Sequence, residues 1–402
     1  MRKFLLVGIA LIGAFVASAQ DVNKSELSTS NIVEISERIA KSEKRIDKLE
    51  NVRQYLKVTG FIQGEYDWLE DRDRRQATGT SSFYIRRARI AMSGDLYKGK
   101  KGAKLDYRLY FDIARIPKNP ILDMWIRYQP CKEFGIQFGQ YKNPVTFEAS
   151  ISPALYEFVD FSYVVQNLAK MGANDVTGYN MTARDMGFQL FGGFIHRDGY
   201  SIINYNIGVL NGNGINTKDD NKSKDVYAKL TINTSKEFAL AAYYQWGEAN
   251  LSSTKESDPT KYAEYGWSGN AEYVAMHRWG YGFKYTSDNV FARAEYIGGI
   301  TGKLPSEGAY IHGGYKFQLP KQAGKIYAGA MVDYFCRNCF DYIHRDTKNA
   351  AIDMRYSVCV GYEPVKYFHI QLAYALEHRI NRTFANNRPF GNGVKVMATA
   401  IF

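Results

Sequence analysis

The side chains with the widest chemical range in this chain are its histidines and cysteines. No two histidines have the His-Glu-x-x-His spacing of a zinc hydrolase or another recognisable metal-binding pattern. The sequence also lacks a Gly-x-Ser-x-Gly nucleophile turn and a nucleotide-binding phosphate loop. Cys336 and Cys339 have the spacing of a redox motif or half a zinc site, but no second pair follows at zinc-site spacing. We therefore predict no enzyme, no metal and no cofactor, and interpret the cysteines as an incidental loop disulfide or free thiols. The histidines are His196, His277, His312, His344, His369 and His378.

Charged residues that alternate with apolar ones offer another chemistry, the attraction of dissolved ions. In segment 104–113 the odd positions are apolar or aromatic: Leu105, Tyr107, Leu109, Phe111 and Ile113. The even positions are mostly charged: Lys104, Asp106, Arg108 and Asp112. Such a charged face is unsuited to a protein core and suited to a water-filled lumen. The pattern predicts a strand between lipid and water.

Two further segments repeat this alternation. In one, Asp123, Trp125 and Arg127 are predicted to face inward. The outward residues of that segment are predicted to be Leu122, Met124, Ile126 and Tyr128. In the other, Gln63, Glu65 and Asp67 oppose the apolar or aromatic residues Ile62, Tyr66 and Trp68.

The period of two begins at Val58 and continues to the end of the chain. It predicts sixteen strands, of which the three just described are the first, third and fourth. The others are expected at 83–97, 134–142, 185–196, 200–209, 224–233, 238–248, 279–286, 290–299, 308–317, 325–335, 355–363, 367–379 and 393–402.

The predicted links alternate between short and long. Short links include 130–133, 197–199, 287–289 and 364–366. The long links are 70–82, 143–184, 210–223, 249–278, 336–354 and 380–392, and the links at 116–120 and 300–307 are shorter exceptions. Short turns at one rim and long loops at the other are typical of bacterial outer-membrane barrels with an even number of strands. We therefore predict an all-β fold, a 16-stranded antiparallel transmembrane barrel over residues 57–402.

The amino-terminal part differs in composition. Basic residues precede an apolar run, and Ala17-Ser18-Ala19 supplies small residues for cleavage, so we interpret 1–19 as a signal peptide. Residues 20–56 are expected to form a polar linker and a short amphipathic α-helix over 31–56, either a coiled coil or a helix against the barrel. A carboxy-terminal alternating segment that ends at Phe402 agrees with assembly into a bacterial outer membrane.

Bulk composition narrows the function classes. The mean hydropathy is −0.37, and no apolar run after residue 19 is long enough for a spanning helix. Aromatic residues make up 15% of the chain, which favours strands whose ends lie at a membrane interface. The formal net charge of +11 favours anionic solutes or lipid surfaces. Export makes nucleic acid the poorest partner, and none is predicted.

Several motifs occur in the order found in one known family. They are Phe83-Tyr84-Ile85-Arg86-Arg87-Ala88-Arg89-Ile90, Phe138-Gly139-Gln140-Tyr141-Lys142-Asn143-Pro144 with Glu148, Arg184-Asp185-Met186-Gly187, Gly208-Val209-Leu210-Asn211-Gly212-Asn213-Gly214, Ala294-Glu295-Tyr296, and Gly308-Ala309-Tyr310 with Gly314-Tyr315. Over residues 58–402 the chain resembles the phosphate-selective porin O/P family. The resemblance implies a homotrimeric bacterial porin with sixteen strands, an inward-folded third outer loop and passage of anions. It does not explain the amino-terminal helix.

The link 143–184 is the predicted constriction, because a loop of that length usually has a function. Its aromatic residues are candidate anchors against the lumen wall: Phe147, Phe158, Phe161 and Tyr163. Basic side chains are the candidate anion ligands, since they attract phosphate-like oxygens. The candidates are Arg87, Arg89, Lys104, Arg108, Arg127, Lys142, Lys170 and Arg184. Arg86 is out of phase with Arg87 and Arg89 but is also assigned to the lumen.

Two other functions stay open at this point. The lumen could be a nonspecific pore, because Asp106, Asp112 and Asp123 share faces with the basic residues. The barrel could also be a structural or interaction protein that is anchored through its amino-terminal helix. Stepwise conductance in a bilayer would separate a pore for small hydrophilic solutes from a closed structural barrel.

Overall fold

A computed structural model describes residues 37–38, 41–42, 52–70, 80–116, 120–171, 182–219, 221–250, 273–320, 323–339, 350–381 and 389–402. The chain has two compact units, Met1–Gln54 and Tyr55–Phe402. In the first unit the described residues, 37–38, 41–42 and 52–54, are helical. The predicted signal peptide and most of the predicted helix lie outside the described residues. No helix within the described ranges has the length and apolar character that crossing a membrane requires.

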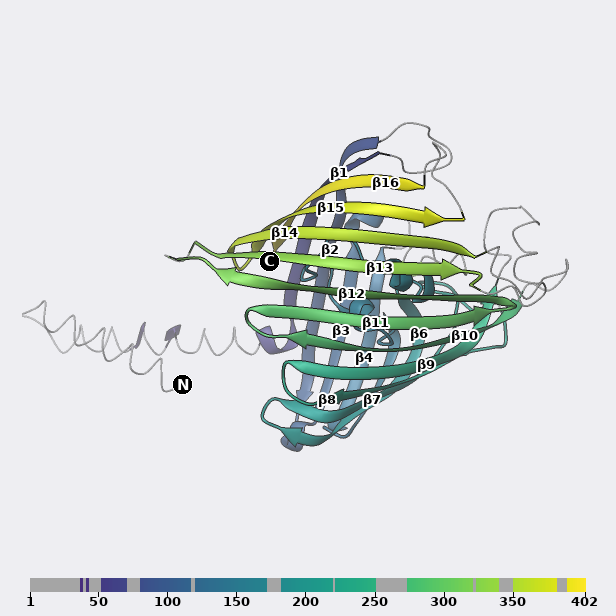
Figure 1. The fold of residues 1–402 in the computed structure, drawn as a ribbon. Coiled ribbons are helices and arrows are strands. Elements are labelled where there is room, and N and C mark those ends of the chain that lie inside the picture. Colours follow the sequence, from purple (N-terminus) through teal and green to yellow (C-terminus); the bar gives the residue numbers. More distant parts are fainter. Residues whose placement is uncertain are drawn as a thin grey trace, which may run out of the picture. The chain divides into compact units, whose positions relative to one another are not determined.

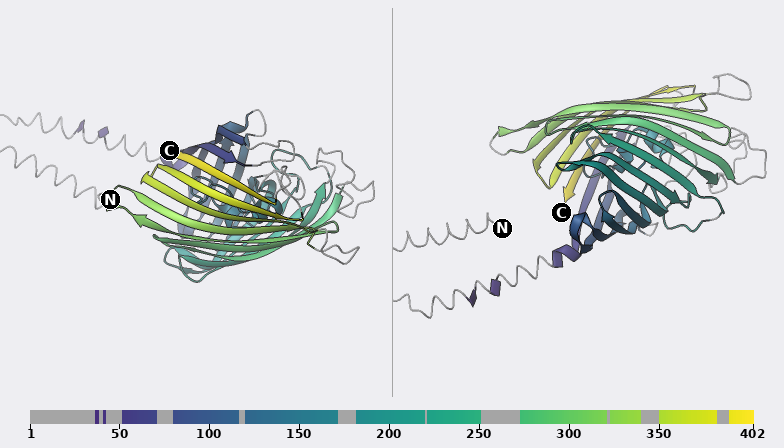
Figure 2. Two further views of the ribbon diagram at one scale, coloured as in Figure 1. Left: turned by 45° about the horizontal axis from the view of Figure 1, so that its top comes forward. Right: turned by 90° about the horizontal axis from the view of Figure 1, so that it is seen from below.

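Among the described residues, sixteen strands of the second unit form one closed antiparallel barrel (Figure 1). Each strand pairs with its sequence neighbours, and β1 closes the ring by pairing with β16. The strands are β1 Lys57–Leu69, β2 Thr80–Lys98, β3 Lys104–Asp112, β4 Ile121–Cys131, β5 Phe134–Lys142, β6 Arg184–Arg197, β7 Tyr200–Leu210, β8 Asp225–Asn233, β9 Phe238–Asn250, β10 Tyr273–Thr286, β11 Val290–Thr301, β12 Leu304–Gln318, β13 Lys325–Arg337, β14 Ala351–Val365, β15 Phe368–Ile380 and β16 Phe390–Ile401. The prediction of a 16-stranded antiparallel barrel is confirmed. Closure gives each of these described strands a hydrogen-bonded neighbour on both sides (Figure 2).

The two rims have different connections. At one rim, residues 132–133 join β4 to β5 and residues 198–199 join β6 to β7. At the other rim, residues 143–183 separate β5 from β6. The predicted link at 300–307 is wrong in length, because β11 and β12 are joined by Gly302 and Lys303 alone. Gly302 has φ 61°, and this left-handed conformation lets Thr301 pair directly with Leu304.

The wall has two chemically different faces, as the alternation predicts. Along β1, Gln63 and Glu65 are buried on the inner side, whereas Ile62 and Trp68 are exposed on the outer side. Strand β3 buries Asp106 and Asp112 on the inner face. Apolar residues on the outside match a lipid environment, and polar residues inside match water.

Leu122 is a correction to the predicted faces. It is fully buried and packs with Tyr110, Phe61 and Ala154 inside the barrel rather than pointing outward. The physical reason is a register irregularity in the β3–β4 pairing, where Tyr110 pairs with Asp123 but Phe111 pairs with Ile121. A β-bulge of this kind places two successive side chains on the same face.

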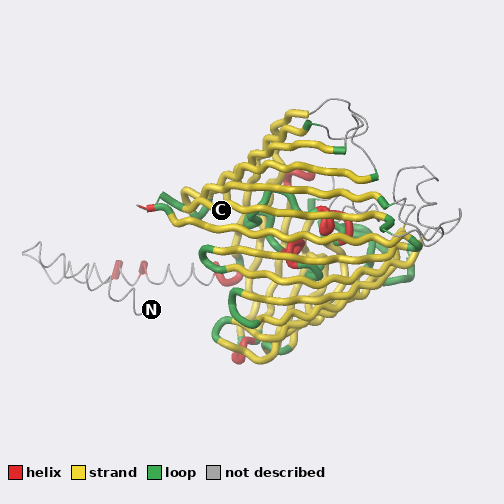
Figure 3. Tube along the Cα trace, in the orientation of Figure 1, coloured by secondary structure: helices red, strands yellow, loops and turns green. Residues whose placement is uncertain are grey.

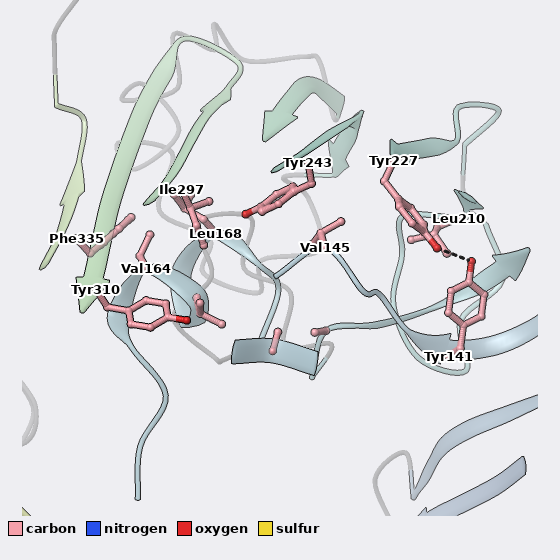
Figure 4. Packing of buried hydrophobic residues seen from close by; sticks show 13 residues of the cluster. Tyr141, Val145, Val164, Leu168, Leu210, Tyr227, Tyr243, Ile297, Tyr310 and Phe335 are labelled. Atoms are coloured by element: carbon pink, nitrogen blue, oxygen red, sulfur yellow. Dashed lines mark hydrogen bonds between the residues drawn. The ribbon is translucent and has the colours of Figure 1, made fainter. Parts of the chain in front are cut away.

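Residues 143–171, here called the inner segment, pack against the inner faces of the strands. The segment contains two short helices, α3 Phe147–Ser150 and α4 Tyr163–Leu168, which the strands surround in Figure 3. Thr146 begins α3, because its side chain accepts a hydrogen bond from the Ala149 backbone N–H. From α4, Val164 and Leu168 lie beside Ile297 and Phe335 of the barrel wall (Figure 4). The core of this protein therefore lies between the inner segment and the barrel wall.

Candidate functional site

A recess in the lumen gathers arginines from separate parts of the chain. It has a volume of about 290 Å³. Three arginines come from β2, one from the 3₁₀-helix η3 (Ile113–Arg115), and one from β6. We call it the arginine recess. Its lining is Arg86, Arg87, Arg89, Asp112, Arg115, Pro153, Asp160, Phe161, Gln166, Met171, Thr182 and Arg184.

A β-bulge lets β2 point two consecutive arginines into the lumen. Gln63 pairs with Arg87, but the next residue, Gly64, pairs with Ile85, so Arg86 is the extra residue of the bulge. The Arg87 guanidinium donates to Gln63 Oε1 at 2.8 Å and has no carboxylate within ion-pair distance among the described residues. Arg86 forms ion pairs with Glu65 and, at 2.7 Å, with Asp160.

Two other arginines are held by carboxylates from neighbouring strands. Arg89 Nε lies 2.9 Å from Asp112 Oδ2, and Arg184 Nε lies 2.6 Å from Asp123 Oδ1. The Tyr110 ring lies 5.7 Å from each of these guanidinium carbons, within the range of cation–π attraction. These contacts fix the orientation of both side chains.

Arg115 brings a further cation to the recess. Its buried Nη1 has no hydrogen-bond partner among the described residues. Burial, with the nearby arginines Arg89 and Arg184, lowers the pKa of Arg115 despite the opposing effect of Asp112. An oxygen of an entering anion would satisfy this donor. The recess lining contains five arginines and two aspartates, so its positive charge exceeds its negative charge.

A second region of the barrel wall, formed by β11 to β14, uses its charges differently. Arg355 forms a buried ion pair with Asp333 at 2.7 Å and donates to the Phe161 carbonyl at 2.6 Å. Glu295 accepts the Phe147 and Glu148 backbone N–H groups at 2.7 and 3.0 Å. We call these three residues, Arg355, Asp333 and Glu295, the paired wall, because they are satisfied by one another and by the inner segment.

Glu148 connects two parts of the inner segment. Its carboxylate accepts hydrogen bonds from the Ser162 backbone N–H at 3.0 Å, from the Ser162 hydroxyl at 2.5 Å and from the Tyr156 hydroxyl. Burial raises the pKa of Glu148 to about 7, against the effect of these donors, and the neighbouring Glu295 adds to the rise. The buried carboxyl group of Glu148 thus connects α3 to the residues that precede α4.

Comparison with known proteins identifies the class of this barrel. The sequence profile described as "Phosphate-selective porin O and P" matches residues 56–318. The chain belongs to this family. It is an outer-membrane porin, and its class is that of channels rather than enzymes. Curated protein sequences give no match.

Solved barrels show the same fold as this porin at low sequence identity. The trimer form of OmpT from Vibrio cholerae has a TM-score of 0.58 at 11% identity, over 86% of this chain and 99% of that one. OprB of Pseudomonas putida has a TM-score of 0.58 at 10% identity, over 89% and 96% of the two chains. The outer membrane channel DcaP of Acinetobacter baumannii has a TM-score of 0.57 at 13% identity, over 86% and 97%.

Three predicted ligands of the porin lie together in the recess: Arg87, Arg89 and Arg184. Lys142 is near them, within electrostatic reach of Arg89 and Arg184, and it donates to the Ile151 carbonyl at 2.9 Å. Of the eight predicted anion ligands, these four lie in or near the recess.

The remaining candidates lie elsewhere in the porin. Lys104 forms ion pairs with Asp95 and Asp106 at 2.9 Å, and Arg127 binds the same Asp106 at 2.6 Å. Arg108 pairs with Asp123 at 3.3 Å. Lys170 pairs with Asp225 at 2.9 Å and donates to the Gly212 carbonyl, so it fastens the end of the inner segment. None of these four lines the recess.

Sequence reasoning missed Arg115 and Asp160 of the recess. It assigned Arg86 to the lumen, as the structure has it, but the alternation does not reveal the bulge that places it there. Arg115 lies after the end of β3, where no strand pattern applies. Asp160 belongs to the inner segment, whose path has no sequence periodicity. The consecutive arginines at 86 and 87 were the available signal.

The described residues contain neither a disulfide nor a cluster of metal ligands. Within the described ranges, no three His, Cys, Asp or Glu side chains gather closely enough to hold a metal ion. The four cysteines are free thiols, and Cys339 Sγ lies 3.1 Å from the Cys336 carbonyl oxygen.

Proposed function

We propose that this porin gives passive diffusion to small hydrophilic solutes and prefers anions of the phosphate type. The observation that carries the proposal is the excess of arginines over acids in the arginine recess. A permeating anion loses part of its hydration, and a surrounding set of fixed cations offsets that loss. Guanidinium groups present planar donor pairs that match phosphate oxygens and stay charged at any accessible pH.

The link 143–184 is proposed to narrow the passage. In support, the described residues 143–171 contribute Pro153, Asp160 and Phe161 to the recess lining. Three of the four aromatic side chains predicted as anchors are largely buried: Phe147 7%, Phe158 2% and Phe161 6% exposed. The fourth, Tyr163, is half-buried. If the passage is narrowest beside fixed cations, permeating solutes are selected by charge and by size at the same point.

A nonspecific pore is the second candidate, because many lumen cations are neutralised. Lys104 and Arg127 share Asp106, and Arg108 and Arg184 share Asp123. A lumen whose cations are all neutralised would select solutes by size alone. The anion proposal therefore depends on Arg87 and Arg115, which form no ion pair with a carboxylate among the described residues.

Assembly and export complete the proposal. A homotrimer is supported by the family resemblance and by the trimer form of the V. cholerae barrel. Export through a cleaved signal peptide at 1–19 remains part of the proposal.

The reversal potential of the full chain in a planar bilayer tests this function. In a tenfold gradient of potassium chloride we expect the sign of an anion-preferring channel, and added phosphate should reduce the chloride current at millimolar concentration. A potential of the cation-preferring sign would remove the anion proposal. If phosphate and chloride block the current equally, the assignment is reduced to a nonspecific pore. Conductance steps that occur in groups of three would support the homotrimer.

A further inference from the structure

We propose that Arg86 and Lys395 form a carboxylate-binding subsite in the lumen, and that the porin's own Asp160 occupies it. Asp160 then determines specificity, because a permeating anion must compete with this tethered carboxylate. The inference rests on the proposed passage of anions and names a residue that limits it.

The contacts of Asp160 define the subsite. Its Oδ1 accepts from Arg86 Nη2 at 2.7 Å, and its Oδ2 accepts from Lys395 Nζ at 2.5 Å. Arg86 lies on β2 and Lys395 on β16, the two strands that flank β1. Two cations from different strands thus converge on both oxygens of one carboxylate, which is the arrangement that a free carboxylate would need.

The inner segment does not depend on Asp160 for its position. The next residue, Phe161, is held by Arg355 through its carbonyl at 2.6 Å. Gln371 Nε2 donates to the Tyr156 carbonyl at 3.0 Å, and Gln63 Nε2 donates to the Pro153 carbonyl at 3.1 Å. Since backbone contacts on both sides fix the segment, the main effect of the Asp160 carboxylate is its charge.

Asp160 also lies where its charge acts on permeation. It lines the arginine recess, and its side chain is 23% exposed. Burial opposes its ionisation, but Lys395 and Arg86 outweigh burial and hold the pKa of Asp160 well below its usual range. The subsite is therefore filled by a permanent anion. Removing that anion would leave Glu65 as the remaining described partner of Arg86 and, at 4.0 Å, of Lys395.

The substitution Asp160→Asn tests the subsite while it preserves side-chain size. In 0.1 M salt we expect the anion-to-cation permeability ratio to rise about threefold, since one negative charge leaves the narrow part of the lumen. Acetate carries the same carboxylate group that the substitution removes, and it should block the chloride current. We expect its half-blocking concentration to be at least about fivefold lower in Asp160→Asn than in the wild type, because the subsite is no longer occupied.

Asp95→Asn is the matched control. Asp95 also contacts two lysines, Lys98 and Lys104, at 2.9 Å and has a 22% exposed side chain, but it does not line the recess. We expect it to change the acetate block less than twofold. Adding Lys395→Gln to Asp160→Asn should return the acetate block to near the wild-type value. Heat-modifiable mobility of each variant confirms that its barrel is folded.

Equal acetate sensitivity in the wild type and Asp160→Asn, or an equal change in Asp95→Asn, would overturn the subsite. A cation-selective wild type would overturn the proposed function instead. The acetate comparison between variants would then still decide whether Asp160 occupies a carboxylate subsite.

Discussion

The arginine recess and the paired wall belong to the same lumen and adjoin at Phe161, yet they use charge for different purposes. On the paired wall, Arg355 and Asp333 are both almost fully buried, and their contacts reach the backbone of the inner segment. In the recess, Arg87 has only an amide oxygen as partner and Arg115 has an unsatisfied buried nitrogen within the described structure. Charges that are fully paired hold structure, whereas charges left in excess beside water remain able to act on ions.

Breaking the paired wall should have the largest effect on stability. Arg355→Ala leaves Asp333 buried without its cation and frees the Phe161 carbonyl, so we expect a loss of about 3–5 kcal/mol in unfolding free energy. Urea unfolding of the purified barrel measures it. The control is Arg127→Ala, which removes a 29% exposed member of an ion pair and should cost less than about 1 kcal/mol. Equal losses in the two variants would remove the distinction between the regions.

The pH dependence of the inner segment should follow Glu148. Because burial raises its pKa to about 7 in the folded protein, the folded state holds a proton that the unfolded state has released between about pH 4.5 and 7. Stability should therefore fall as pH rises through this window, by up to about 3 kcal/mol. Unfolding curves of the wild type and Glu148→Gln at pH 5 and 7.5 check this. The stability of Glu148→Gln should not show this fall between pH 5 and 7.5. If the variant and the wild type have the same pH profile, the role of Glu148 is contradicted.

The smallest expected effect is the loss of one recess charge. Arg87→Gln should lower the anion-to-cation permeability ratio about two- to threefold in 0.1 M salt, since a charge several ångströms from the path contributes little in water. Its unfolding free energy should change by less than about 1 kcal/mol, because it forms no ion pair among the described residues. Lys98→Gln, at an exposed position near the end of the same strand, is the control and should leave the ratio unchanged. A stability loss without a change in ratio would place Arg87 with the paired wall.

Regular features of this fold could be predicted from the sequence. Alternation along β1 and β3 marks which side chains face water, because each residue of a strand reverses direction. Arg87 and Arg89 were candidates on a predicted strand, 83–97, which the structure extends to Thr80–Lys98. Arg184 was predicted as the last residue of the link 143–184, and the structure makes it the first residue of β6. That the three lie together in one recess was not predicted.

Irregular features could not be predicted in this way. Bulges at Arg86 and Leu122 change the phase within a strand, and nothing in the local composition marks them. Arg115 and Asp160 lie outside the strands, so their positions depend on tertiary contacts rather than on periodicity. The two-residue turn at Gly302 and Lys303 likewise reflects pairing that extends farther than the apolar pattern indicates.

The most direct test of this comparison is the reversal potential of a double variant, Arg87→Gln with Arg115→Gln, beside the wild type in the same potassium chloride gradient. The account predicts an anion-preferring potential for the wild type and a potential near zero or of the opposite sign for the variant. A folded double variant that keeps the wild-type potential would contradict it, because selectivity would then arise outside the two arginines without a carboxylate partner in the described recess.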